Sequence, residues 1–245
     1  MLLSYGKVVK ASSFVKGKEP FHAVDENVQT WWRAVADKSG EWLEVDLGEA
    51  YDVRAVQINF ADDALSPPLP EEAILRGGPH QERWIDETHQ PTRWILEGSL
   101  DGAVYFIIED KSATDTDLPH DFVLREEGFK MRYVRLTVIA LPYGQAACVS
   151  GLRVFGLGHG KKPAVASRVT AVWESELDLG LSWEGNAKGY NVLWGFAPEK
   201  LYHSLMAFDR KARIGGIVKG QPVYVRIDSF NESGITEGVV INESR

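Results

Sequence analysis

Residues 41–60, EWLEVDLGEAYDVRAVQINF, alternate apolar and polar side chains in both halves of the stretch. Leu43, Val45 and Leu47 stand two positions apart with acidic residues between them, and Val56 and Ile58 repeat the spacing. Side chains two positions apart project from the same face of a β-strand. The stretch is therefore predicted to form strands that bury one face and expose the other to water.

The same period of two runs through most of the chain. It returns in residues 134–138, 179–183, 190–194 and 223–227. The pair Asp101 and Gly102, a combination favoured in tight hairpin turns, separates two further apolar segments. No segment shows a sustained helical period with capping residues, which argues against a nucleotide-binding fold of alternating strands and helices. We therefore predict an all-β chain.

The size and charge of the chain exclude several classes of protein. Its 245 residues are 44% apolar and 25% charged, enough to bury a full core, and the formal net charge is -8. An acidic chain is poorly suited to bind phosphate backbones or anionic membranes, so we expect no nucleic-acid or membrane partner. A single cysteine, Cys148, permits no internal disulfide.

The organisation along the chain points to two domains. Residues 156–167, GLGHGKKPAVAS, interrupt the alternation and are interpreted as a linker. We predict one domain over residues 1–158 and a second over residues 159–245. Between two predicted strands, residues 62–91 are rich in proline, glycine and charge, and loops of this length in compact domains are usually functional or mobile. The opening MLLSYGKVVK lacks the apolar core of a signal peptide, and we expect a piece of a longer chain.

Short motifs occur in a characteristic order over the first domain. They are GKVVKASS (6–13), AVDENVQTWW (23–32), EWLEVDLGEAYDVRAVQI (41–58), LEGSLDG (96–102), RYVRLTV (132–138) and SGLRVFG (150–156). In this order they resemble the discoidin family, also called coagulation factor type C, and the related family 32 carbohydrate-binding modules. The resemblance implies an eight-stranded jelly-roll sandwich, in agreement with the alternation.

The second domain resembles fibronectin type III units. The segments LSWEG (181–185), GYNVLWG (189–195) and VYVRIDSFNESGIT (223–236) carry the resemblance, which implies a seven-stranded sandwich. One position departs from the pattern. Val223 stands where an aromatic residue often begins the late strand, which puts the tyrosine-corner hydrogen bond in doubt.

The pairing of the two domains is similar to the C-terminal region of bacterial family 43 glycoside hydrolases of the xylosidase and arabinofuranosidase type. Segments 117–123 and 189–209 add to this likeness. It implies a non-catalytic accessory region of a secreted, periplasmic or cell-surface enzyme, whose catalytic propeller would lie upstream. The first domain would bind a polysaccharide or oligosaccharide. The alternative is a purely structural module that braces the catalytic domain and has no affinity for glycans.

No catalytic residues are expected within this chain. The neighbouring carboxylates at 71 and 72, and those at 126 and 127, would point to opposite faces of a strand, so they cannot flank one glycosidic bond. The six histidines show no metal-ligand spacing. Sugar-binding candidates are aromatic, Arg and His side chains in loops: Trp31, Arg76, His80, Trp84, His89 and Tyr143. For each of them the alternative is a packing role.

The discoidin resemblance also implies a structural calcium beside the loop at 25–30. Asp25 and Thr30 match the family's ligands, and Asn27 stands where a backbone carbonyl would point inward. Gly151, however, occupies the position of a family glutamate in the last strand. Calcium prefers six to eight oxygen ligands, preferably from more than one carboxylate. The alternative is that Asp25 and Thr30 cap a turn through their own backbone.

Overall fold

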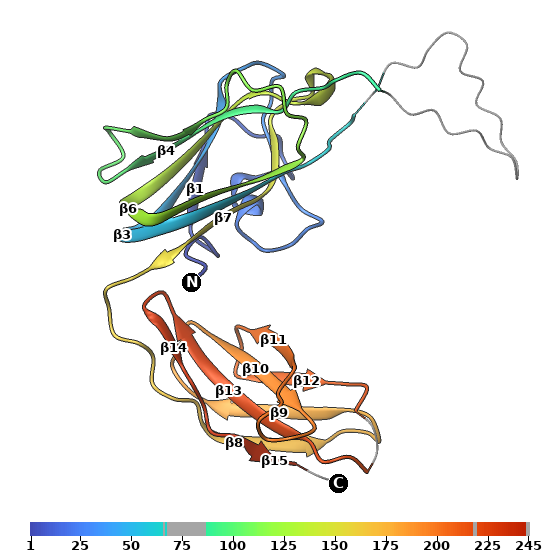
Figure 1. Ribbon diagram of the computed structural model, residues 1–245. Coiled ribbons are helices and arrows are strands. Elements are labelled where there is room, and N and C mark those ends of the chain that lie inside the picture. The colour runs from blue at the N-terminus through green and yellow to red at the C-terminus, as the bar shows by residue number, and fades with distance from the viewer. Residues whose placement is uncertain (66, 68–86, 218–219, 244–245) are drawn as a thin grey trace, which may run out of the picture. The chain divides into compact units, whose positions relative to one another are not determined.

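A computed structural model describes residues 1–65, 67, 87–217 and 220–243, and its ordered elements are strands and two short 3-10 helices (Figure 1). The prediction of an all-β chain is confirmed for these residues. The chain divides into two compact units, Leu2–Gly156 and Leu157–Arg245. Neither 3-10 helix approaches the length or apolar content that a membrane span requires.

The first unit is one antiparallel sheet system that folds over on itself. Its strands follow the order β2-β7-β3-β6-β4-β5, and β1 pairs with β3. The 3-10 helices η1 (Pro20–Ala23) and η2 (Pro142–Gly144) lie in its loops. The strands are β1 (Val8–Ala11), β2 (Trp32–Arg33), β3 (Glu41–Phe60), β4 (Arg93–Ser99), β5 (Phe106–Asp110), β6 (His120–Ala140) and β7 (Cys148–Leu157).

The long strands β3 and β6 pair side by side and serve both layers of the sandwich (Figure 1). Their register shifts between Asp46 and Tyr51, and again between Val53 and Ala55, which divides the ribbon into two halves. β1 and β4 pair with the first half, whereas β7 lies along the second half. The result is a jelly-roll-like sandwich. Seven strands are assigned in its described residues, where eight were expected, and β3 and β6 each continue through these register shifts as a single long strand.

The period-two side chains of β3 form the core of this unit. Leu43, Val45, Leu47 and Ile58 are all completely buried. Trp32 is also completely buried, and its indole N–H donates to the Ser13 carbonyl at 2.9 Å. Trp32 therefore packs the core.

The second unit consists of a three-stranded and a five-stranded sheet. The first has the order β12-β9-β8, and the second has the order β11-β10-β13-β14 with β15 paired to β13. Trp183, Tyr190, Val192 and Ile227 lie in the core between the sheets. The strands are β8 (Ser167–Trp173), β9 (Leu179–Glu184), β10 (Gly189–Gly195), β11 (His203–Ala207), β12 (Lys211–Ile214), β13 (Tyr224–Asn231), β14 (Gly234–Thr236) and β15 (Ile241–Asn242).

Candidate functional site

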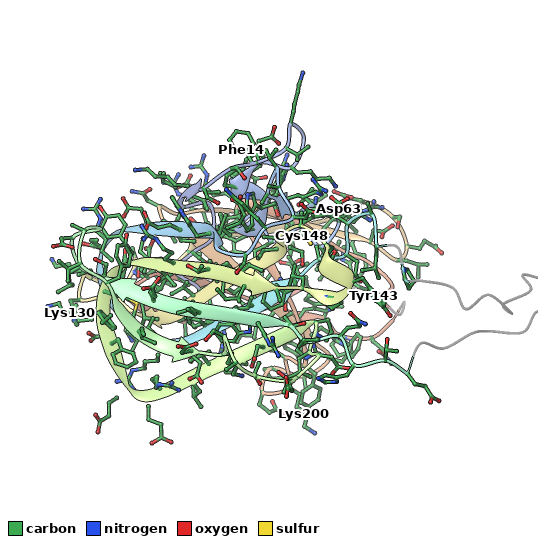
Figure 2. All side chains as sticks on the ribbon, turned by 90° about the horizontal axis from the view of Figure 1, so that it is seen from above. Phe14, Asp63, Lys130, Tyr143, Cys148 and Lys200 are labelled. Carbon is green, nitrogen blue, oxygen red and sulfur yellow. The ribbon has the colours of Figure 1, made fainter. Side chains whose placement is uncertain are left out.

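A cavity of about 390 Å³ opens at one end of the first unit, where three loops meet. The loops follow β2, β3 and β6. In Figure 2, Asp63, Cys148 and Tyr143 gather at this end of the unit, away from Lys130. The lining residues are Arg33, Val35, Asp37, Asp63, Ala64, Tyr143, Gly144, Gln145 and Ala146. The walls are mostly polar, with one aromatic ring.

Trp31 lies beside this cavity and is held by internal contacts. Its indole N–H donates to Asp63 Oδ2 at 2.8 Å, and Lys18 Nζ lies 3.0 Å from the centre of its ring. Arg33 Nε approaches the same Asp63 oxygen at 3.7 Å. One face of the Trp31 ring is therefore covered by an ammonium group. The hydrogen bond from its indole N–H holds the Asp63 carboxylate in place.

Tyr143 lies on the opposite wall, in a loop with an unusual backbone conformation. Its φ of 58° and ψ of 22° fall in the left-handed region, which only a few per cent of non-glycine residues adopt. The Tyr143 N–H donates to Gln90 Oε1 at 3.0 Å, and Gln145 Oε1 accepts the Asp63 N–H at 3.2 Å. These amide contacts connect the loop to both of its neighbours. They hold Tyr143 at the rim, where its side chain is half-buried.

The two carboxylates of the cavity differ in whether they already have hydrogen-bond or ion-pair partners within the protein. Asp63 is engaged with Trp31 and Arg33, whereas exposed Asp37 has no recorded partner among the residues that the structure describes. Carboxylates accept hydrogen bonds from hydroxyl groups, and a guanidinium donates them. Together with the phenol ring, these groups suit a small, hydroxyl-rich ligand that has one less polar face.

Cys148 lies behind the cavity and is chemically quiet. Its thiol is buried and lies 2.8 Å from the Ala61 carbonyl oxygen. Burial, followed by the charges of Asp63 and Asp62, raises the thiol pKa to about 12. A nucleophilic cysteine needs the thiolate near neutral pH. This residue therefore gives the cavity no nucleophile.

Only some of the residues predicted from the sequence to bind sugar lie at this end of the unit. Tyr143 lines the cavity and Trp31 supports it from behind. His89 is exposed and precedes Gln90, which holds the Tyr143 loop. Arg76, His80 and Trp84 lie outside the described residues. Arg33, Asp63 and Gln145 also line the cavity but were not predicted from the sequence, because β2 and the two loops that carry them share no common motif.

The predicted calcium ligands form a self-contained turn. Asp25 Oδ1 accepts the Asn27 N–H at 2.8 Å, and Asp25 Oδ2 accepts the Thr30 hydroxyl at 2.7 Å. His22 Nδ1 lies 3.1 Å from the same Oδ2. No group of three potential metal-binding side chains occurs within the described ranges. With one carboxylate whose oxygens are both engaged, these residues as they lie do not fit a calcium site.

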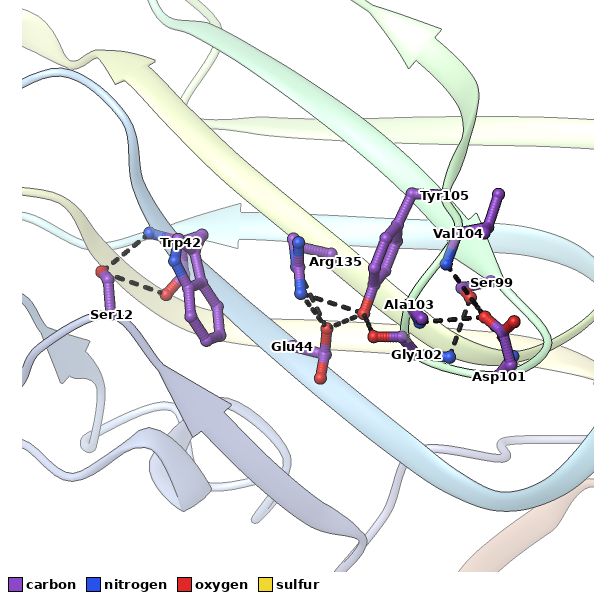
Figure 3. Close-up of polar contacts among 10 residues, drawn as sticks. All are labelled: Ser12, Trp42, Glu44, Ser99, Asp101, Gly102, Ala103, Val104, Tyr105 and Arg135. Atoms are coloured by element: carbon purple, nitrogen blue, oxygen red, sulfur yellow. Dashed lines mark hydrogen bonds and ion pairs between the residues drawn. The ribbon is translucent and has the colours of Figure 1, made fainter.

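A second polar cluster lies on the outer face of the sheet, opposite the core side chains of β3 (Figure 3). Arg135 donates to Glu44 Oε2 at 2.7 Å and to the Tyr105 hydroxyl at 2.9 Å. Its guanidinium lies 4.8 Å from the centre of the Trp42 ring and 3.9 Å from that of Tyr105. The Asp101-Gly102 turn covers the cluster, since the Tyr105 hydroxyl also donates to the Gly102 carbonyl at 3.1 Å. With its donors and acceptors satisfied by one another, the cluster is structural.

Comparison with known families supports the assignment of the first unit. Residues 22–136 match a family model described as F5/8 type C, NedA-like, galactose-binding domain. Over this segment the chain is similar to galactose-binding-like domains of the F5/8 type C kind. The match ends within β6 and does not extend to the second unit. No curated protein matches the chain.

Three solved structures that resemble part of this chain are described as a chitosan-binding module, a fucose-binding module and a family 89 glycoside hydrolase. Chitosan-binding module 1 from a chitosanase/glucanase of Paenibacillus sp. IK-5 is 17% identical with a TM-score of 0.47, and the match covers 64% of this chain and 99% of that one. A fucose-binding module of Streptococcus pneumoniae is 14% identical with a TM-score of 0.46, over 64% and 99%. A family 89 glycoside hydrolase from Clostridium perfringens is 18% identical with a TM-score of 0.46, over 69% and 16%.

Proposed function

We propose that the first unit binds carbohydrate in the cavity beside Tyr143 and contributes no catalysis. The observation that carries the proposal is the place of the cavity, at the loop end of a galactose-binding-like domain. Its volume of about 390 Å³ falls in the usual range for small-molecule sites. No adjacent nucleophile or metal cluster accompanies it among the residues with described positions.

The chemistry of the walls matches the chemistry of a sugar. A pyranose ring presents C–H groups on one face, which can pack against the Tyr143 ring, and hydroxyl groups around its edge. Those hydroxyls can donate to Asp37 and accept from Arg33. Because Asp63 is fixed by Trp31, it offers its remaining acceptor capacity in a preset orientation.

The proposal is tested by calorimetric titration with galactose-type, xylan and arabinan oligosaccharides, first on the natural chain and then on Tyr143→Gly. The substitution removes the ring and supplies a residue that adopts positive φ without strain, so the fold is retained. We expect binding to weaken at least about tenfold, or roughly 1.4 kcal/mol. If the natural chain binds none of these sugars at millimolar concentration, the structural brace with no glycan affinity becomes the better account.

The same proposal assigns the second unit to the fibronectin type III class. Seven of its strands divide three and four between the sheets β12-β9-β8 and β11-β10-β13-β14, a division that supports such a sandwich. In this account the chain is an accessory region of a secreted, periplasmic or cell-surface family 43 glycoside hydrolase, and its other partner is the upstream catalytic domain. This assignment is tested by sequencing the gene from which the chain derives. If that gene encodes no propeller upstream, the hydrolase assignment fails while sugar binding can still stand.

A further inference from the structure

A larger cavity, of about 730 Å³, opens at one end of the second unit. The turn after β9 forms one side, and the turn between β11 and β12 forms the other. Its walls include Asn186, Tyr190, Phe208, Asp209, Arg210 and Lys211. Loops at the end of a rigid sandwich are a frequent location for binding residues.

A buried hydroxyl group at the cavity has unused hydrogen-bonding capacity. Tyr190 is 1% exposed, and its oxygen accepts the Ala187 N–H at 3.2 Å. For its own O–H proton, the described part of the second unit records no acceptor. Gly185 keeps space open here, since a Cβ at that position would lie 2.5 Å from the hydroxyl. The ring is fixed edge-on against Trp183, with 5.2 Å between centroids, so the hydroxyl is held in place.

The charged groups at the rim are also unused. The side chains of Asp209, Arg210 and Lys211 are exposed, and each is without a recorded ion pair within residues 157–217 and 220–243. By contrast, Arg213, two residues further along β12, forms ion pairs with Glu174 at 3.1 Å and with Asp178 at 2.9 Å. Lys211 lies opposite Ser182 in the register, and both residues are exposed and line the cavity.

Donors therefore outnumber acceptors in this cavity. Tyr190, Asn186, Arg210 and Lys211 all donate, and two of them are cationic, whereas Asp209 is the one carboxylate of the lining. Such a set favours an anion with several acceptor oxygens, and a carboxylate fits this description. The two units also differ in charge. Residues 2–156 hold 16 Lys and Arg against 25 Asp and Glu, whereas residues 157–245 hold 11 against 10. An anionic ligand is therefore repelled less by the second unit.

Phe208 adds an apolar surface to the same wall. Its side chain is 39% exposed, and its ring meets Phe230 edge-on, at 6.2 Å between centroids and an interplanar angle of 84°. An aromatic ring held in this way can pack on the C–H face of a sugar ring at little cost in side-chain entropy. This surface favours a carboxylate carried on a sugar over a carboxylate carried on a flexible peptide.

We propose that this cavity is a second binding site, which takes a uronic-acid residue of a glycan. The carboxylate lies near Arg210, Lys211 and the Tyr190 hydroxyl, and the sugar ring packs on Phe208. The Asp209 carboxylate accepts a hydrogen bond from a ring hydroxyl. The site shares no residue with the cavity beside Tyr143, so it stands whether or not the first unit binds sugar.

The proposal is tested on the full chain by titration with oligogalacturonate, with the neutral galactose oligomer of equal length as the matched ligand. We expect the uronate to bind at least about tenfold more tightly, and its affinity to fall as salt is added. The double variant Arg210→Gln with Lys211→Gln should lose about tenfold in uronate affinity. As a control, Lys200→Gln changes an exposed lysine at the other end of β10 and should leave binding unchanged.

Further variants separate the two sites and the two sources of carboxylate. Tyr190→Phe removes only the hydroxyl and should weaken uronate binding, with the melting temperature as the check on folding. Tyr143→Gly should leave uronate binding unchanged. Equal affinity for the uronate and the neutral oligomer in the Tyr143→Gly variant, no effect of the double variant, or equally tight binding of a glutamate-rich peptide would each overturn the proposal.

Discussion

Arg153 of β7 donates its Nε–H to both carboxylate oxygens of Glu26, at 2.9 and 3.0 Å. Both side chains are only 23% exposed, and the pair joins the last strand of the first unit to the loop that begins at Asp25. Glu26 adopts a φ of 60°, a left-handed conformation that the ion pair helps to hold. A guanidinium from β7 thus lies against the loop where the family resemblance predicts a cation.

Loss of this pair should destabilise the first unit. Glu26→Gln keeps the shape of the side chain and removes its charge, leaving a half-buried guanidinium without a counter-ion. We expect a loss of about 1–2 kcal/mol in the free energy of unfolding, between the values for exposed and for buried pairs. Asp115→Asn is the matched control, because Asp115 pairs with Arg93 at 2.8 Å but its side chain is 80% exposed. Equal losses in the two variants, measured by urea unfolding, would contradict this account.

Calcium should have little effect on the same loop. The two oxygens of Asp25 are already engaged by Asn27, Thr30 and His22. Because a calcium ion would have to displace these contacts, we expect no change in melting temperature between millimolar calcium and a chelator. A calcium-dependent rise that disappears in Asp25→Asn would show that the loop rearranges into a metal site.

The outer cluster should make stability fall at high pH. Burial, together with the hydrogen bond and charge of Glu44, raises the pKa of Tyr105 to about 12. An unfolded tyrosine titrates near pH 10, so the folded state retains the Tyr105 proton over a range in which the unfolded state loses it. The stability from this group is complete below about pH 10 and is lost as the pH rises through about 12. Tyr105→Phe should remove this part of the pH dependence, measured by urea unfolding from pH 9 to pH 12.

The negative charge of Glu44 contributes to the raised pKa of Tyr105, and this contribution can be tested by itself. Glu44 is 7% exposed and is the carboxylate that faces Arg135. Glu44→Gln should therefore lower the pKa of Tyr105, which is followed by the ultraviolet absorbance of tyrosinate during an alkaline titration. The same titration of Tyr105→Phe gives the absorbance of the other tyrosines, which is subtracted. An unchanged Tyr105 titration in Glu44→Gln would show that burial alone sets the value.

The sequence predicts the fold of this chain better than its binding residues. The alternation at Leu43, Val45 and Leu47 reports burial directly, since each side chain contacts the core of its own sheet. The cavity depends instead on Arg33, Asp63 and Gln145, which come from β2 and from the loops after β3 and β6 and meet only after the sandwich closes. No local period marks such residues. Trp31 illustrates the limit, because no local pattern predicts that Lys18 lies over its ring or that Asp63 accepts its indole N–H.

Cys148 should be unreactive until the first unit unfolds. Its thiol is buried and its pKa is raised to about 12, chiefly by burial, so almost no thiolate is present near pH 8. We expect a disulfide reagent to label the native chain far more slowly than the chain unfolded in urea. Labelling of the native chain at the rate of a free thiol would show that the wall formed by Ala61 and Gln145 opens readily.

Among Trp31, Trp32 and Trp42, substitution of Trp32 should cause the largest loss in the free energy of unfolding. Its ring is completely buried and its indole N–H is satisfied by Ser13, whereas Trp42 is half-buried under Arg135 on the outer face. Truncation of a buried aromatic side chain costs about 3–5 kcal/mol, so Trp32→Ala should unfold the first unit or leave it marginal. Trp32→Phe is the milder variant, which keeps most of the volume and leaves the Ser13 carbonyl unpaired. In urea unfolding it should lose more stability than Trp42→Phe, and the opposite order would show that the outer cluster, and not the core, dominates the stability of the 21–48 segment.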